Sequence, residues 1–310
     1  MIRRPPRSTH CISSAASDVY KRQGFNAGLS KFVPAVTVNK MCGSGLKTVI
    51  MGSEQIKAKT NNILVAGGME SMTNAPYLSK NNRDGARIGH VKVYDHMFLD
   101  GLEDAYEEGK LMGSFAEDTA EHYQFTREQQ DNFAITSLER AKKANEDGTF
   151  ESEIVPIKVL NRKNEIIINK DEQPFKSDIT KIPTLKPAFR KNGTVTAANS
   201  SSISDGASSV ILMLESEAQK RGIKPLARII DHSTNSQEPK WFTTAPIGAI
   251  EKVLEKSGWK KTDVDLFEVN EAFAVVPMAV MKDIGLSLIH ISESTRRTPI
   301  SYAVFCLKKK

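Results

Sequence analysis

The sequence predicts an α/β fold in which a sheet of parallel strands is covered by helices. An apolar run at residues 33–38 is followed by a segment with apolar residues at helical spacing, and a second apolar run lies at 63–66. This order of strand, helix and strand is a βαβ unit, which places its two strands parallel in one sheet. Further apolar runs and helical segments alternate from residue 209 onward, so the sheet pattern resumes late in the chain.

The first helix is expected to follow residue 43 and to pack through a single face. That face repeats at helical spacing and comprises Leu46, Val49, Ile50, Ser53 and Ile56. The next strand, residues 63–66, is expected to end at Gly67 and Gly68, after which residues 69–77 leave the sheet as a polar loop.

Residues 73–203 differ from the segments around them in having more charge and more turn residues. Thr126 and Gln129 have the spacing of a capping box, which opens a helix that Asp147 and Gly148 end. The buried stripe of this helix is expected to comprise Gln130, Ala134, Leu138 and Ala141. Residues 158–191 are rich in Lys, Asn and Pro, with a short strand at 166–169. They are predicted to form an inserted, loop-rich segment that covers the core without being part of it.

The later part of the chain predicts strands at 209–214, 227–231 and 264–269. Helices are predicted at 217–221, ended by Gly222, at 247–256, ended by Gly258, and again after residue 273. The pattern is interrupted at about residue 287, so this part of the sheet is expected to be unfinished.

Both ends of the chain differ from its middle. Residues 1–23 and 287–310 are rich in Arg, Ser and Thr, and they resemble translated sequencing adapter, so we expect non-native tails there. The alternative is a pair of basic, disordered arms that bind nucleic acid. Each tail has a net charge of +4 and the whole chain +6, which leaves the residues between them at −2. The net positive charge of the chain therefore comes from the tails, and no nucleic-acid partner is expected.

Cys42 is the one cysteine between the two tails, since Cys11 and Cys306 lie within them. A single unpaired cysteine favours a reducing compartment, and we expect a cytoplasmic protein without disulfides. No run approaches the ~18 apolar residues that a membrane span needs, so no membrane association is expected.

Cys42 is also the leading candidate for a catalytic residue. It lies between the strand at 33–38 and the helix that follows, and Gly43 and Gly45 let other groups approach the backbone. A helix N-terminus favours a thiolate, and a thiolate is a nucleophile. The alternative is a small buried hydrophobic residue. The same segment lacks the ending of a phosphate-binding loop, and Thr48 stands where a dinucleotide fingerprint has Gly or Ala, so nucleotide binding is set aside.

Five sequence blocks, taken in order, carry a family resemblance. They are VNKMCGSGLK around Cys42, AGGMESM at 66–72, NAPY at 74–77, GTVTAANSSSISDGAS at 193–208 and VNEAFA at 269–274. Together they resemble the thiolases, and the resemblance covers residues 24–286. The surroundings of residues 100–102 and of Met112 and Gly113 look most like acetyl-CoA acetyltransferases.

The resemblance implies a layered α/β/α/β/α architecture with an inserted loop domain, truncated in both halves. The N-terminal half would comprise residues 24–72 and 204–224, the loop domain that covers coenzyme A residues 73–203, and the start of the C-terminal half residues 225–286. Members of the family are dimers or tetramers, so a homo-oligomer is expected.

The resemblance also implies a reaction and its residues. Cys42 would take the acetyl group from acetyl-CoA, and the acyl-enzyme would react with a second acetyl-CoA to give acetoacetyl-CoA, with thiolysis as the reverse. Asn270 would hold a water in an oxyanion hole. The substrate arm would contact Met112, Ser201, Ala272 and Phe273. Coenzyme A enters as part of the substrate, no separate cofactor is implied, and the histidines have no metal-ligand spacing with Cys42.

The sequence departs from the family pattern at several positions. Leu111 stands where many members have His, and Phe175 where some have Arg. The chain contains neither the G-H-P-x-G motif, whose histidine activates the nucleophile, nor the C-x-G-G motif, whose cysteine moves the substrate proton. Two alternatives therefore stand beside an acetyl-CoA acetyltransferase: a 3-ketoacyl-CoA thiolase of longer chain specificity, and a non-catalytic fragment. A redox-sensing role for Cys42 is a further alternative, but no resolving cysteine lies near it in the sequence.

Overall fold

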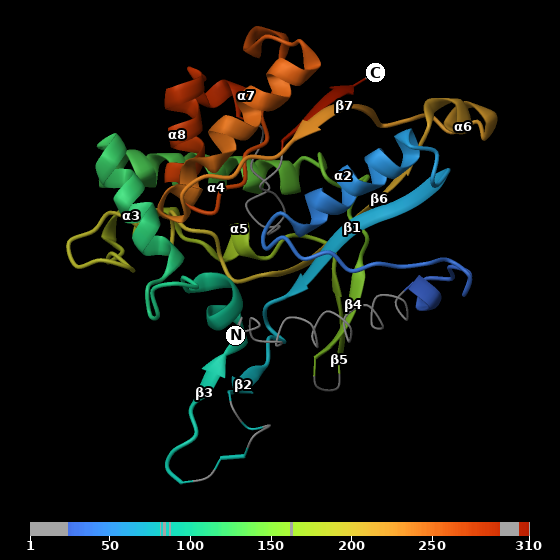
Figure 1. The fold of residues 1–310 in the computed structure, drawn as a ribbon. Coiled ribbons are helices and arrows are strands. Elements are labelled where there is room, and N and C mark those ends of the chain that lie inside the picture. Colours follow the sequence, from blue (N-terminus) through green and yellow to red (C-terminus); the bar gives the residue numbers. More distant parts are fainter. Residues whose placement is uncertain are drawn as a thin grey trace, which may run out of the picture.

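The computed structural model of the chain describes residues 24–80, 82, 85–86, 88–161 and 164–291, and the backbone of 304–309 (Figure 1). The helices are α2 (Ser44–Lys57), α3 (Met112–Tyr123), α4 (Arg127–Glu146), α5 (Gln173–Lys176), α6 (Glu215–Lys220), α7 (Ala245–Ser257) and α8 (Val275–Ile284). The strands are β1 (Ile63–Ser71), β2 (Tyr77–Ser79), β3 (Val93–Asp95), β4 (Ile157–Asn161), β5 (Asn164–Ile168), β6 (Asp205–Met213), β7 (Ala227–Ser233) and β8 (Val304–Lys309). Short 3₁₀ turns cover Ile179–Thr184, Pro239–Thr244, Lys261–Asp263 and Leu288–His290, and a π-helical turn covers Phe98–Leu102.

The described strands form four two-stranded antiparallel sheets: β1 with β6, β2 with β3, β4 with β5, and β7 with β8. The mixed α/β class is confirmed, but the parallel βαβ unit is wrong for this part of the chain. Residues 33–38 form no strand, because none of the described strands lies beside them to complete a hydrogen-bonded ladder, and Val36 is 71% exposed. Residues 264–269 form no strand for the same reason: only Phe267 makes a bridge, to Ile291.

Helix α2 lies along one face of the β1–β6 pair (Figure 1). The close approach depends on Gly52, where a Cβ atom would lie 2.7 Å from Leu212 Cδ1. The predicted helix is confirmed, with Ile50, Ser53 and Ile56 buried. Strand β1 is also confirmed, but it continues through Gly67 and Gly68 to Ser71 instead of ending there.

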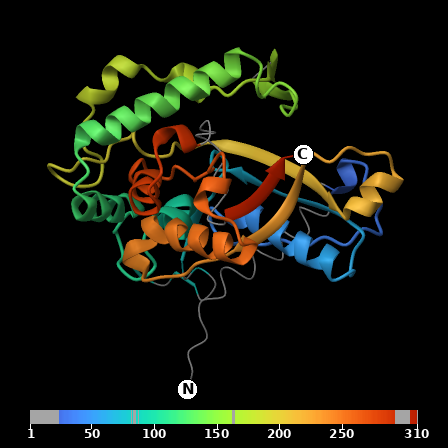
Figure 2. The ribbon, with the colours of Figure 1, turned by 90° about the horizontal axis from the view of Figure 1, so that it is seen from above.

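The main core lies among α3, α7 and α8. Seen from above, α8 lies between α4 on one side and α7 on the other (Figure 2). The buried side chains of this core include Ala116, Val195, Ile250, Val275, Val276 and Val280. Every residue of α8 from Val275 to Val280 is buried, so this helix lies within the main core.

Helix α4 begins as the sequence predicts. Thr126 accepts a hydrogen bond from Gln129 N, and the Gln129 side chain returns one to Thr126 N, which is the expected capping box. The predicted stripe from Gln130 to Ala141 is buried. Helices α6 and α7 are likewise confirmed, and α7 ends at Gly258 in a left-handed conformation with φ of 70°.

The expected non-native tails fall partly outside the described residues, which do not include 1–23 or 292–303. In the later tail, residues Leu288–His290 form a 3₁₀ turn, Ile291 is buried, and the backbone of β8 pairs with β7. The foreign origin of these segments stays a prediction.

Candidate functional site

Cys42 lies in a tight turn directly before α2. Its neighbour Met41 has a φ of 49°, the left-handed region that residues other than glycine rarely adopt. Two polar side chains hold this conformation: Asn39 Oδ1 accepts from Met41 N at 2.9 Å, and Ser44 Oγ donates to Met41 O at 2.6 Å. Strained residues of this kind concentrate at functional sites, where the surrounding structure imposes them.

The thiol of Cys42 is partly buried, and this burial raises its pKa. A hydrogen bond from the Cys42 backbone lowers the pKa, but the carboxylate of Glu70 on β1 raises it further. The expectation that the start of α2 favours a thiolate is therefore wrong, because burial raises the pKa of the thiol by more than the backbone hydrogen bond lowers it. The raised pKa favours the neutral thiol of Cys42 over the thiolate.

The strand that carries Glu70 is fixed to α2 by the half-buried hydroxyl of Thr48. Thr48 Oγ1 lies 3.0 Å from both Gly67 N, which donates to it, and Gly67 O. At Gly67 the two strands of the sheet are so close that a Cβ atom would lie 2.2 Å from Ser208 O. The hydrogen bonds between Thr48 and Gly67 therefore fix α2, and with it the Cys42 turn, against β1.

Two of the predicted substrate residues, Ser201 and Ala272, are brought together by backbone hydrogen bonds. Ser201 N donates to Ala272 O at 2.8 Å, and Ala274 N donates to Asn199 O at 2.8 Å. An isolated antiparallel bridge joins Ser200 to Phe273 between them. Residues about seventy positions apart in the sequence therefore form one short ladder beside α8.

Met112 and Phe273, the other predicted substrate residues, belong to the same apolar group. Both contact the main core, and the ring of Phe189 meets that of Phe273 edge-on, with centroids 6.0 Å apart. Phe189 also covers the backbone of Gly113, where a Cβ atom would lie 2.3 Å from the ring. The structure therefore collects Met112, Ala272 and Phe273 into one neighbourhood, with Ser201 at its edge.

Asn270 is half-buried and lies at the start of the segment that carries Ala272 and Phe273. The next residue, Glu271, accepts a hydrogen bond from Ser137 Oγ of α4 at 2.7 Å. The hydrogen bonds and ion pairs found among the described residues include none between Asn270 and Cys42. Cys42 directly precedes α2, and the N-terminal end of this helix is the end nearer to α3, α7 and α8 (Figures 1 and 2).

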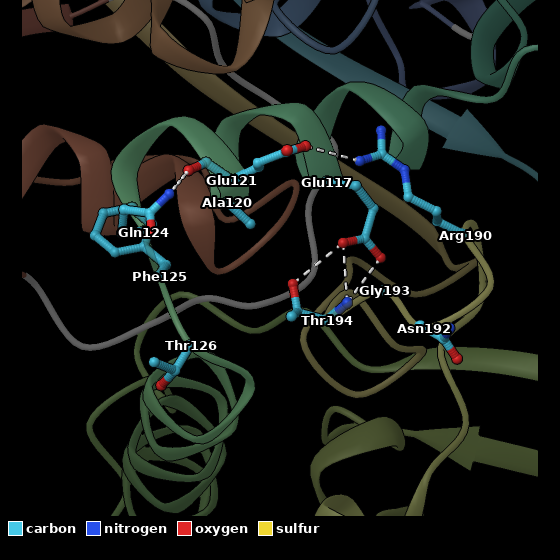
Figure 3. Close-up of a pocket in the computed structure, with 10 residues that line it drawn as sticks. All are labelled: Glu117, Ala120, Glu121, Gln124, Phe125, Thr126, Arg190, Asn192, Gly193 and Thr194. Carbon is cyan, nitrogen blue, oxygen red and sulfur yellow. Dashed lines mark hydrogen bonds and ion pairs between the residues drawn. The ribbon is translucent and has the colours of Figure 1, made fainter.

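Sequence reasoning missed the buried polar residues behind these segments, chiefly Glu117, Asp131 and Asn199. Glu117 of α3 is 3% exposed and accepts from Thr194 N and Thr194 Oγ1 at 2.9–3.1 Å (Figure 3). It also accepts from Val195 N at 2.9 Å. It lines a surface pocket of about 350 Å³ together with Arg190 and Gly193. The available signal was its position: a charged residue on the apolar stripe of α3, one residue after buried Ala116 and three before buried Ala120.

Within the described part of the chain, no group of three or more His, Cys, Asp and Glu side chains is arranged to hold a metal ion. No helix among those residues is both long and apolar enough to span a membrane.

Two family models match the chain. Residues 12–216 match the model described as the thiolase N-terminal domain, and residues 223–294 match the thiolase C-terminal domain. Among curated relatives, a probable acetyl-CoA acetyltransferase of Dictyostelium discoideum is 47% identical over 273 residues, covering 87% of this chain and 66% of the relative. An acetyl-CoA acetyltransferase of Schizosaccharomyces pombe is 44% identical, covering 84% of this chain and 66% of the relative. The chain thus spans about two thirds of the length of these relatives.

Two solved structures are similar in fold. The crystal structure of the Bacillus anthracis acetyl-CoA acetyltransferase has a TM-score of 0.85 and 38% identity, covering 90% of this chain and 72% of that one. The Acat5 thiolase of Ascaris suum, solved in complex with coenzyme A, has a TM-score of 0.83 and 34% identity, with the same coverage of both chains. The layered mixed α/β architecture expected from the sequence is therefore confirmed at the level of the fold.

Proposed function

Because this chain belongs to the thiolase family, we propose that it transfers acetyl groups between thioesters, with acetyl-CoA as donor and Cys42 as acceptor. The observation that carries the proposal is the short ladder that joins Ser201 to Ala272. The family resemblance assigns both residues to the substrate arm, and they lie far apart in the sequence. The similarity to proteins named acetyl-CoA acetyltransferases supports the choice of acetyl-CoA.

In the first half of the reaction, the Cys42 sulfur attacks the carbonyl carbon of acetyl-CoA. A bond forms between Cys42 Sγ and that carbon, the bond from the carbon to the coenzyme A sulfur breaks, and the thiol proton ends on coenzyme A. Negative charge develops on the thioester oxygen, so hydrogen-bond donors near it lower the barrier. The raised pKa of the Cys42 thiol means that removal of its proton is part of this barrier.

In the second half, a second acetyl-CoA loses a proton from its methyl group and attacks the acetylated Cys42. The new carbon–carbon bond gives acetoacetyl-CoA, the bond to Cys42 Sγ breaks, and the proton lost by the methyl group restores the thiol. Asn270 would hold a water that donates to the developing oxyanion, and Met112, Ser201, Ala272 and Phe273 would contact the substrate arm. Thiolysis of acetoacetyl-CoA is the reverse.

The proposal extends to assembly and location. A homo-oligomer, dimeric or tetrameric, is supported by the family resemblance, and a cytoplasmic location by the lone Cys42 between the two ends of the chain. Light scattering on the purified chain measures the first, and a single-subunit mass would contradict it. Fractionation of the source cells measures the second.

The direct test is acetylation of Cys42. The purified chain is incubated with acetyl-CoA, digested and measured by mass spectrometry, with Cys42→Ser as the control variant. We expect one added acetyl group on the Cys42 peptide and none on the control peptide. If acetyl-CoA binds, but the wild-type chain and Cys42→Ser gain acetyl groups to the same extent, the role of Cys42 is contradicted. Acylation from medium-chain acyl-CoA in preference to acetyl-CoA would favour a 3-ketoacyl-CoA thiolase instead.

A further inference from the structure

Three of the residues assigned to the substrate arm, Ser201, Ala272 and Phe273, lie on two segments without regular structure, 193–201 and 270–274. Irregular segments hold a geometry only if their polar backbone groups are bound elsewhere. Here both segments are fastened to one helix, α4, by buried polar side chains. Asp131 of α4 binds the first segment through Asn199, and Ser137 of α4 binds the second through Glu271.

Asn199 makes the more extensive connection. Its side chain is 1% exposed, and its Nδ2 donates to Asp131 Oδ1 and to Thr194 O, both at 3.1 Å. Its Oδ1 accepts from Thr196 N at 2.7 Å, and its own carbonyl oxygen accepts from Ala274 N at 2.8 Å. The residue is therefore bonded to α4, to its own segment and to the second segment at once.

The carboxylate at the base of this connection is itself held in place. Asp131 is buried, and its Oδ2 accepts from Arg127 Nε at 2.6 Å, so the buried charge is compensated. The same guanidinium donates to the carbonyl oxygens of Ile182 and Leu185 at 3.0 and 2.9 Å. Movement of Asp131 would break these bonds too, so its position is well determined.

We propose that Asn199, held by Asp131, is a positioning residue that sets the pairing between the segment of Ser201 and the segment of Ala272. This inference rests on the proposed function for its consequence, because Ser201 and Ala272 contact the substrate arm only if that function is correct. Asn199 reaches the site through the backbone: it fixes Ala274 and, two residues along its own segment, the Ser201 amide that donates to Ala272.

Ser137 of α4 holds the second segment, 270–274, as Asp131 holds the first. Its hydroxyl is buried and donates to Glu271 Oε2 at 2.7 Å, which holds the residue between Asn270 and Ala272. One helix thus fixes both sides of the ladder, from points six residues apart.

The test compares Asn199→Ala with Asn145→Ala. Asn145 is a buried asparagine on α4 that bonds Ala141 O and Asp171 N, neither of which belongs to the two segments, so it controls for general loss of stability. Hydrogen exchange is measured at the Ser201 and Ala274 amides, together with the Kd of acetyl-CoA by calorimetry and the alkylation rate of Cys42 by iodoacetamide.

We expect Asn199→Ala to speed exchange at both amides by about tenfold or more, because the charge-assisted bond and the bonds within the segment are lost together. The Kd of acetyl-CoA should rise by a similar factor, while the alkylation rate of Cys42, on a different element, stays unchanged. Equal exchange in Asn199→Ala and Asn145→Ala would overturn the proposal, and so would faster exchange with no change in Kd. If Asn199→Ala does not fold, Asp131→Asn decides the question, since it keeps an acceptor and should give the same pattern at a few-fold magnitude.

Failure of the proposed function has a different signature. A wild-type chain that shows no acetyl-CoA binding would contradict that function. The amide-exchange comparison would still decide whether Asn199 sets the pairing of the two segments.

Discussion

Replacement of Gly193 by alanine tests whether the buried carboxylate of Glu117 holds the segment that leads to Ser201. A Cβ atom at residue 193 would lie 2.1 Å from Glu117 Oε1 and 2.6 Å from its Cδ. Ordinary contacts between such atoms are about 3.5 Å, so the carboxylate oxygen would have to retreat by roughly 1.4 Å. That movement is large compared with the tolerance of a hydrogen bond.

The magnitude follows from the bonds that the retreat breaks. Glu117 Oε1 accepts from Thr194 N at 3.0 Å and from Val195 N at 2.9 Å. A hydrogen bond to a charged group contributes about 1.5–3 kcal/mol, so the loss of two destabilises by about 3–6 kcal/mol. The alanine restricts the unfolded chain and offsets about 0.4–1 kcal/mol of this. We therefore expect the free energy of unfolding to fall by about 2 kcal/mol or more for Gly193→Ala.

The assay is urea unfolding followed by the fluorescence of Trp241 and Trp259. The matched control is Gly101→Ala, because a Cβ atom there meets nothing within 4 Å, and we expect a change within about 1 kcal/mol. In a Glu117→Ala background the clash with the carboxylate is gone and only the tight contact with Arg190 O at 3.0 Å remains, so Gly193→Ala should cost much less there than in the wild-type background. A loss below about 1 kcal/mol in the wild-type background, or full additivity in the double variant, would refute the reasoning.

Four shorter predictions concern the remaining features of the site. Alkylation of Cys42 by iodoacetamide should rise with pH to a midpoint above the ordinary thiol value of 9.0, and Glu70→Gln should lower that midpoint; a wild-type midpoint below 9.0 would contradict the role of burial. Burial lowers the pKa of His232, so the native state binds fewer protons than the unfolded state near the ordinary value of 6.5; the free energy of unfolding should fall as pH drops through that value, and a variant His232→Gln with the same slope would exclude this residue as the source. Gly113→Ala should displace the Phe189 ring and weaken acetyl-CoA binding measured by calorimetry, whereas an unchanged Kd would separate this ring from the substrate arm. Since the sequence has no G-H-P-x-G or C-x-G-G motif, condensation of acetyl-CoA in a spectrophotometric assay should be slower than in an intact thiolase by about 10³-fold or more, and turnover within tenfold of such an enzyme would contradict this.

Helices were predictable because their signals are local. The capping box at Thr126 and Gln129 needs only residues within one turn, and it forms as expected. Gly258 ends α7 with a positive φ that a residue with a Cβ atom rarely adopts. Neither feature depends on which distant segment the helix contacts.

Strands were less predictable because an apolar run does not specify its partner. Residues 33–38 have the composition of a strand, but the described segments offer them no neighbouring strand. The run at 63–66 does form a strand, and it pairs antiparallel with β6, so the order strand, helix, strand did not imply a parallel ladder here. Pairing is a non-local property, and periodicity in one segment does not contain it.

In the candidate site too, the residues within the sequence blocks could be predicted, whereas the buried residues that hold those blocks in place could not. The sequence blocks that carry Ser201 and Ala272 lie side by side in the structure, joined by the hydrogen bond from Ser201 N to Ala272 O and by the bridge from Ser200 to Phe273. The supporting residues Glu117 and Asp131 were missed, because a carboxylate on an amphipathic helix is normally on the solvent face. Their burial is stable only because other segments supply donors, which no local pattern reveals.

Cys42, the proposed nucleophile, shows why the position of a thiol and its ionisation are separate questions. The turn before α2 could be located from Gly43 and Gly45, but two opposing effects act on the thiol there: the nearby backbone favours the thiolate, whereas burial and the Glu70 charge favour the thiol. Their balance depends on how much chain covers the turn and on which strand lies beside it. Since burial raises the pKa of the thiol, the proposed acyl transfer needs a proton acceptor while the thioester is being attacked, and the departing coenzyme A sulfur is the final acceptor. The rate of Cys42 acetylation should therefore increase with pH across the range in which the free thiol ionises, and a flat profile there would mean that another group removes the proton before the attack.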